Sequence, residues 1–179
     1  MPNNTTNRLT IEGASVDQFI EDARGQGENK DINDKYVPLD FESLLPTPSE
    51  MLGGKNQPTE NGGWKAPAWY EWRIENWGTI WNCYDFHGEW QPNSPTNYSL
   101  EFYTAWNAPT ALFEKVSVDY PDITFALEFA DEGCAFLGRD TIKNGAVVER
   151  TTYDWCSNEG KDFRKSLGIY FEENEDEEC

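Results

Sequence analysis

The chain has 179 residues and a formal net charge of −19, because 33 acidic residues face only 14 basic ones. A field of this sign repels phosphate backbones and attracts basic proteins, so the composition argues against direct nucleic-acid binding. The length suits one domain, and 10 Phe, 8 Trp and 8 Tyr residues supply the side chains for its core.

The cysteines and the apolar runs bear on the cellular compartment. Cys83, Cys134, Cys156 and Cys179 are far apart in the sequence and form no Cys-x-x-Cys pair. The first residues are polar, unlike a secretory signal, and no apolar run is long enough to cross a bilayer. We therefore expect a cytoplasmic protein whose thiols are reduced.

The first half of the chain predicts a strand, a helix and a long insertion. Residues 8–12 alternate polar and apolar side chains, as a half-buried strand does. Residues 15–25 place Val16, Phe19 and Ala23 on one helical face. The insertion, residues 26–77, is predicted to hold an edge strand or packed loop over 36–45, a surface excursion over 46–63 and a short helix ended by Gly78.

The second half predicts a hairpin, a helix and further strands. Residues 79–86 and 98–106 alternate and predict a hairpin with a long loop. Residues 109–120 carry an apolar helical face that Pro121 ends. Three more strands are expected over residues 123–129, 134–143 and 146–153, the last two joined by the turn-forming dipeptide Asn144-Gly145.

This order of elements predicts an α+β fold, the split βαβ arrangement of a ferredoxin-like sandwich. We expect an antiparallel sheet with two main helices on one face, an inserted Trp-rich segment and extra C-terminal strands. The domain is predicted to span residues 1–153. Residues 154–179 look like an irregular acidic extension, because dense like charges repel one another.

Three sequence blocks resemble the YubB-like proteins, accessory proteins with a ferredoxin-like domain that bacterial plasmids and phages carry. They are Asn7-Arg8-Leu9-Thr10-Ile11-Glu12-Gly13, Trp72-Arg73-Ile74-Glu75-Asn76-Trp77-Gly78-Thr79 and Phe102-Tyr103-Thr104-Ala105-Trp106-Asn107-Ala108-Pro109. The resemblance covers roughly residues 1–150. It departs from the family at Asn4-Thr5-Thr6, where Asn-Trp-Cys is common. It implies a fold and a mobile-element origin in a bacterial host cell, but no activity.

The residue types for catalysis or metal binding are sparse. His87 is the one histidine, and the cysteines lack the spacing of a zinc or iron–sulfur site. The Gly-Gly pairs precede no helix with the Lys and Ser/Thr of a phosphate loop. We expect no catalytic residue, no metal and no cofactor, and a protein that is more a binder than an enzyme.

Two sets of residues are candidates for partner binding. The first is the Trp-rich block, because Trp and Arg are enriched where few residues dominate binding energy. The alternative is that this block fastens the insertion to the sheet. The second set is the acidic tail. The candidates are Trp69, Trp72, Arg73, Asn76 and Trp77 in the block, and Glu172, Glu173, Glu175, Asp176, Glu177 and Glu178 in the tail.

The function expected from these features is that of an acidic inhibitor. Carboxylates arranged like phosphates can occupy a basic DNA-binding channel, so the expected partner is a basic host nuclease or a restriction or CRISPR component. One alternative is a small-ligand binder or enzyme with a cleft near Arg73 or Arg139. Another is a structural module that self-associates through its sheet edges.

Overall fold

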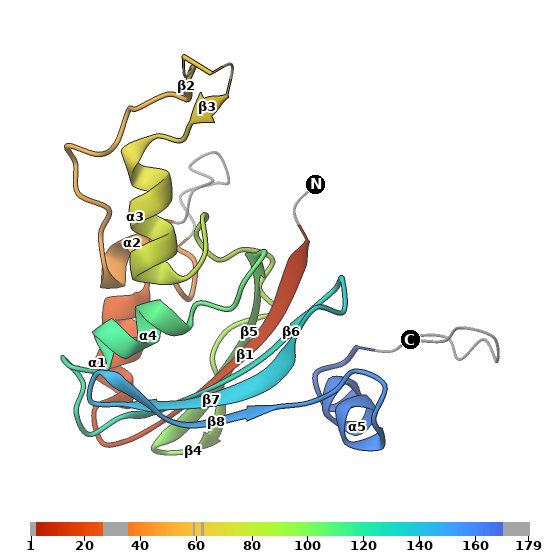
Figure 1. Ribbon diagram of the computed structural model, residues 1–179. Coiled ribbons are helices and arrows are strands. Elements are labelled where there is room, and N and C mark those ends of the chain that lie inside the picture. The colour runs from red at the N-terminus through yellow and green to blue at the C-terminus, as the bar shows by residue number, and fades with distance from the viewer. Residues whose placement is uncertain (1–2, 27–35, 59, 62, 170–179) are drawn as a thin grey trace.

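One antiparallel sheet organises the chain. The computed structural model describes residues 3–26, 36–58, 60, 61 and 63–169. Its six-stranded sheet has the order β4-β5-β1-β6-β7-β8 (Figure 1). The strands are β1 (Asn4–Glu12), β4 (Gln91–Ser94), β5 (Asn97–Ala105), β6 (Thr124–Asp131), β7 (Leu137–Lys143) and β8 (Ala146–Thr152).

The topology is a split βαβ pattern. β1 lies between β5 and β6 and is antiparallel to both. α1 (Val16–Ala23) follows β1, and α4 (Thr110–Val116) connects β5 to β6. β7 and β8 extend the sheet beyond β6 through the Asn144-Gly145 turn, in which both residues have the positive φ that this turn type needs. The predicted α+β ferredoxin-like fold with extra C-terminal strands is confirmed.

The core lies between the sheet and the helices on one of its faces. Alternate residues of β1, such as Leu9 and Ile11, are fully buried, as are Phe125 and Leu127 of β6. Burying a side chain of this size contributes about 1.5–3 kcal/mol. The helices on this face are α1, α4, α2 (Phe41–Leu44) and α3 (Ala68–Trp77) (Figure 1).

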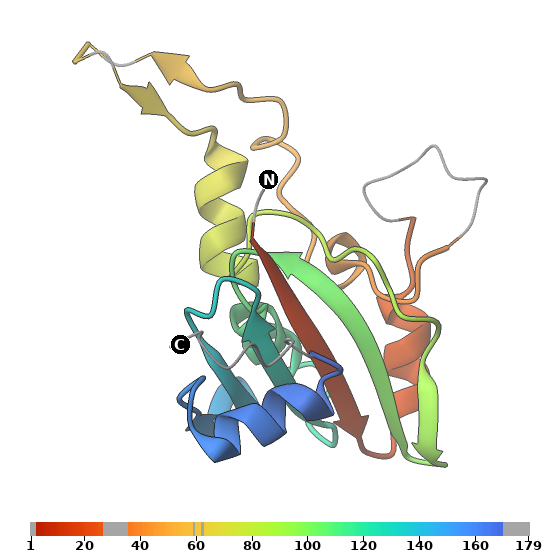
Figure 2. The same ribbon diagram turned by 90° about the vertical axis from the view of Figure 1, so that its right-hand side faces the viewer.

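The insertion supplies two of those helices and a small hairpin. α2 begins at Asp40, whose carboxylate accepts a hydrogen bond from the backbone N–H of Glu42. This helix replaces part of the edge strand or loop expected over residues 36–45, because the Asp40 cap satisfies its first turn. Beyond α3, strands β2 (Gln57–Pro58) and β3 (Trp64–Lys65) form a hairpin that projects away from the sheet (Figure 2).

The prediction of a strand over residues 79–86 is wrong. A single bridge joins Tyr84 to Tyr103 there, and the hairpin partner of β5 is β4, which lies in the expected loop. Asn82 accounts for the difference, because its side-chain oxygen accepts hydrogen bonds from the backbone N–H groups of Phe41 and Cys83. Asp85 then takes a positive φ of 48°, which breaks an extended strand.

We expected irregular structure from residue 154 onward. Part of that segment instead forms a helix, α5 (Asn158–Ser166). The Ser157 hydroxyl caps it by accepting from the N–H of Gly160. A Cβ at Gly160 would lie 1.9 Å from the carbonyl oxygen of Asp154, so glycine is required for this close approach. Through a second small core that includes Leu137 and Leu167, α5 packs on the sheet face opposite the other helices (Figures 1 and 2).

Candidate functional site

The Trp-rich block is built around a buried arginine. Arg73 is 9% exposed, and its guanidinium lies 4.5 Å from the ring centre of Trp77 and 5.3 Å from that of Trp69. It forms a 2.7 Å ion pair with Glu42 of α2 and donates to the hydroxyl of Thr47. Arg73 therefore ties α3 to the segment that carries α2.

The rest of the block serves the same attachment. Trp77 is fully buried, and its indole N–H donates to the carbonyl of Leu45 at 2.9 Å. Trp72 is half-buried against Trp77, with ring centres 6.1 Å apart. The Asn76 amide donates to the carbonyl of Trp72 and accepts from Lys115 of α4. Aromatic packing and hydrogen bonds within the fold bury the side chains of Arg73 and Trp77, which favours attachment of the insertion over partner binding at these two residues.

The second predicted set lies outside the described residues. Glu172, Glu173, Glu175, Asp176, Glu177 and Glu178 all belong to residues 170–179. The acidic tail therefore stays a prediction.

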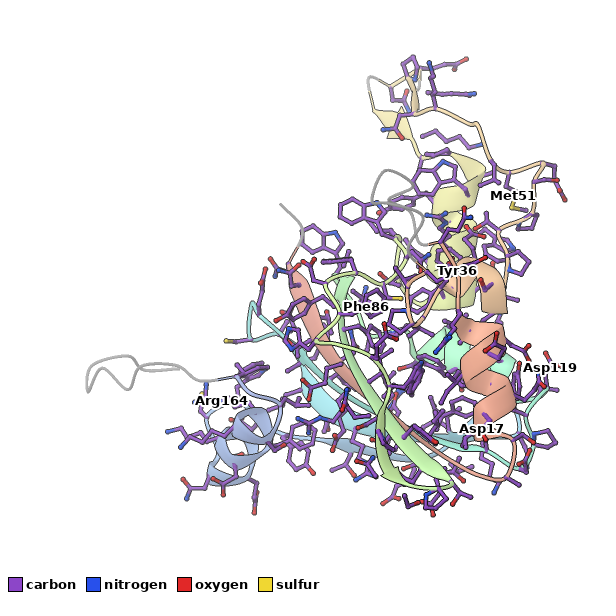
Figure 3. All side chains as sticks on the ribbon, turned by 180° about the vertical axis from the view of Figure 1, so that it is seen from behind. Asp17, Tyr36, Met51, Phe86, Asp119 and Arg164 are labelled. Atoms are coloured by element: carbon purple, nitrogen blue, oxygen red, sulfur yellow. The ribbon has the colours of Figure 1, made fainter. Side chains whose placement is uncertain are left out.

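A surface that we call the α1 acidic surface gathers carboxylates from two segments. Asp17, Glu21 and Asp22 occupy exposed positions of α1, while Asp119 and Asp122 are exposed in the turn between α4 and β6. Two hydrogen bonds hold these segments together: the Tyr120 hydroxyl donates to Asp22 at 2.7 Å, and the backbone N–H of Ser15 donates to Asp122 at 2.8 Å. Figure 3 shows Asp17 and Asp119 on the same side of the molecule.

The arginines of several described ion pairs serve other carboxylates. Arg8 pairs with Glu101 and Glu128 on the sheet face that carries α5, where it also donates to the carbonyl of Ser166. Arg150 of β8 forms a bidentate ion pair with the fully buried Asp140, and both of its N–H···O contacts measure 2.7 Å. Because Arg73 is also engaged, by Glu42, these three arginines are held away from the α1 acidic surface.

The pKa of the Tyr120 phenol is raised by burial and by the carboxylates around it. Burial and its hydrogen bond to Asp22 raise the pKa of the phenol well above 10.0, and the charge of Asp119 adds to this rise. In contrast, the backbone N–H of Ser15 stabilises the charged form of Asp122 and lowers its pKa. One segment therefore combines a phenol held neutral with a carboxylate held charged.

We predict that Asp22→Asn will lower the pKa of Tyr120 toward 10.0, because the variant removes both a charge and a charged hydrogen-bond acceptor. The pKa is measured from the ring carbon shifts of Tyr120 in an NMR titration. Glu71→Gln, on the exposed face of α3, is the control and should leave it unchanged. An unaltered Tyr120 titration in Asp22→Asn would contradict the coupling.

A pocket of about 360 Å³ lies along α1, next to the acidic surface. Trp90 is buried in its wall, and its indole N–H donates to the carbonyl of Pro38 at 3.0 Å. The wall does not include Arg73 or Arg139, where a cleft was expected. The lining residues are Asp17, Ile20, Arg24, Tyr36, Val37, Pro38, Glu89, Trp90 and Tyr98.

Sequence reasoning identified neither of these features. The acidic positions of α1 could have been found, because Asp17, Glu21 and Asp22 lie opposite the apolar face that the periodicity defines. Asp119 and Asp122 could not, since only the tertiary contact with α1 brings them there. The pocket joins segments that are likewise distant in sequence.

His87 is an exposed surface residue. Its Nδ1 lies 3.4 Å from Glu101, which also pairs with Arg8, and its ring meets Tyr103 edge-on. Among the residues described, no cluster of three or more His, Cys, Asp or Glu side chains could hold a metal ion. Nor does any helix in this part of the chain have the length and apolar character needed to span a membrane.

Comparison with known proteins places this fold in a family. Residues 85–177, more than half of the chain, match the family model described as the ferredoxin-like domain in Api92-like protein. The match extends past residue 150, where the resemblance to the YubB-like proteins was expected to end. No curated protein matches the chain.

The fold is similar to that of a solved structure. The crystal structure of a protein api92 from Yersinia pseudotuberculosis matches with a TM-score of 0.51 and 15% identity, over 68% of this chain and 42% of that chain. The chain thus spans about two fifths of that structure. The antiparallel sheet, the helices on it and the match to the family model together define a ferredoxin-like α+β protein. The chain belongs to the Api92-like family.

Proposed function

We propose that this protein is a non-catalytic acidic binder that holds a basic protein against its α1 acidic surface. The observation that carries the proposal is the convergence of five exposed carboxylates, from α1 and the α4–β6 turn, on one side of the fold. A surface of one sign raises the association rate of an oppositely charged partner by about 10- to 1,000-fold at low salt.

The proposed partner is a basic nuclease or another nucleic-acid-binding component of a bacterial host's defence, in the cytoplasm. A net charge of −19 supports this choice, because sites that hold DNA or RNA are rich in Lys and Arg. The proposed origin in a phage or plasmid, which would gain from blocking host nucleases, rests on the resemblance of three sequence blocks to the YubB-like proteins. On this proposal the carboxylates compete with the phosphates of DNA for the same cations.

The proposal is tested with a panel of purified host nucleases, including restriction and CRISPR effectors. DNA cleavage is measured against the concentration of this protein at 50 and 300 mM NaCl. We expect inhibition of at least one nuclease, weaker by about tenfold at the higher salt because screening shortens the reach of surface charges.

A matched pair of variants locates the contact. One neutralises the α1 acidic surface through Asp17→Asn, Glu21→Gln, Asp22→Asn and Asp119→Asn. It should weaken inhibition by roughly fourfold or more, since surface charge contacts contribute about 0.2–1 kcal/mol each. The control makes the same change in net charge elsewhere, through Glu71→Gln, Glu75→Gln, Glu149→Gln and Glu159→Gln.

Two results would overturn the proposal. Equal loss of inhibition in both variants would show that total charge acts rather than this surface. Absence of inhibition across the panel, together with no basic protein retained from host extract at 50 mM NaCl, would remove the binding function itself.

A further inference from the structure

The pocket along α1 adjoins the proposed binding surface. Asp17 belongs to both, since it lines the pocket and carries one of the surface carboxylates. In Figure 3, Asp17 lies on α1, and Tyr36 lies farther along the same side of the molecule. A partner that covers the α1 acidic surface would therefore also cover the mouth of this pocket.

The pocket combines aromatic rings with carboxylates from separate segments. Trp90, Tyr98 and Tyr36 contribute rings, while Asp17 comes from α1 and Glu89 precedes β4. Aromatic faces attract cations through the ring quadrupole, and the attraction grows where the cation is partly removed from water. Both kinds of group thus favour a positively charged guest.

Arg24 is the one cation of the lining. It directly follows the last residue of α1, seven residues after Asp17, so the two lie about 10 Å apart along the helix axis. The antiparallel bridge between Gly25 and Val37 places Arg24 across from Pro38, which also lines the pocket. The lining therefore carries opposite charges at different places, with the carboxylate of Asp17 toward the start of α1 and the guanidinium of Arg24 beyond its end.

We propose that this pocket receives an arginine side chain of the bound basic protein, an inference that rests on the proposed function and names its anchor. A planar guanidinium stacks on aromatic rings and pairs with carboxylates, which a lysine ammonium does less well. A volume of about 360 Å³ accommodates one such side chain. Arginine is also enriched among the few residues that dominate binding energy, especially those that fill pockets.

The test uses the full chain and a defined probe, N-acetyl-L-arginine amide, with N-acetyl-L-citrulline amide as its neutral isostere. Binding is followed by NMR at the indole N–H of Trp90, which bonds to Pro38 in the pocket wall and is assigned with Trp90→Phe. We expect the arginine probe to bind with a dissociation constant in roughly the millimolar range, as for a single side chain. The citrulline probe should bind about fivefold or more weakly.

Charge variants separate this pocket from general attraction. Asp17→Asn with Glu89→Gln should weaken binding of the arginine probe by about fivefold or more. Glu71→Gln with Glu75→Gln, on α3, changes the net charge equally and should leave binding intact. Equal binding of the two probes, or equal loss in the two double variants, would overturn the pocket assignment.

The nuclease assay distinguishes the two proposals. If Glu89→Gln, which lies in the pocket but outside the α1 acidic surface, weakens probe binding yet leaves inhibition at the level of Glu71→Gln, the pocket does not anchor the partner and the proposed function stands. If the arginine probe binds as expected but no nuclease is inhibited or retained, the proposed function fails, and with it the partner assignment.

Discussion

Trp77→Ala is expected to lower the free energy of unfolding by about 3–5 kcal/mol. Trp77 is fully buried, its ring lies under the Arg73 guanidinium, and its indole N–H bonds to Leu45. Alanine removes the ring, leaves a cavity between α3 and α2, and deprives Arg73 and the Leu45 carbonyl of a partner.

The loss is measured by urea denaturation followed by circular dichroism. Trp81→Ala is the matched control, because Trp81 is 37% exposed in the segment that follows α3. It should cost about 1 kcal/mol or less. A loss of less than about 1 kcal/mol in Trp77→Ala would show that the Trp-rich block is not part of the structural core.

Arg73→Met is expected to cost about 2–3 kcal/mol of unfolding free energy. Breaking a buried ion pair on one side typically costs about 3–5 kcal/mol. The expected value is lower because the side chain of Glu42 is 31% exposed, so that water replaces part of the lost contact. Methionine keeps an unbranched apolar side chain but removes the guanidinium that lies over the rings of Trp69 and Trp77.

Arg139→Met is the control for Arg73→Met. Arg139 is exposed on β7, where its loss should change stability by about 0.5 kcal/mol or less. Adding Glu42→Gln to Arg73→Met completes a double-mutant cycle, and the two losses should not add. Additive losses would show that the 2.7 Å contact contributes nothing specific.

These predictions divide the molecule into two parts. The Trp-rich block, first considered as a partner surface, is expected to act on stability. The α1 acidic surface and its pocket are expected to act on binding with little effect on folding, because their carboxylates are exposed. Measuring both quantities for each variant therefore separates attachment from recognition.

The sequence by itself determined the main strands, their antiparallel order and the two helices between them. Alternation in β1, β5 and β6 and the helical spacing of α1 and α4 are local signals, since each reflects which side of an element faces the core. Asn144-Gly145 likewise determined its turn through its own backbone preference. These patterns were enough to predict the ferredoxin-like class.

Only the tertiary structure decided the rest. Residues 79–86 alternate like a strand, yet the Asn82 side chain binds the backbone of Phe41 and Cys83, and the segment pairs with β5 only through the Tyr84–Tyr103 bridge. The sequence pattern did not predict α5, because this helix is polar and is stabilised by its N-cap and by contacts with a sheet face that is distant in sequence. The α1 acidic surface and the pocket are each formed by segments that are far apart in the chain. Local periodicity shows which side of an element faces the core, but it does not show which distant residues come into contact.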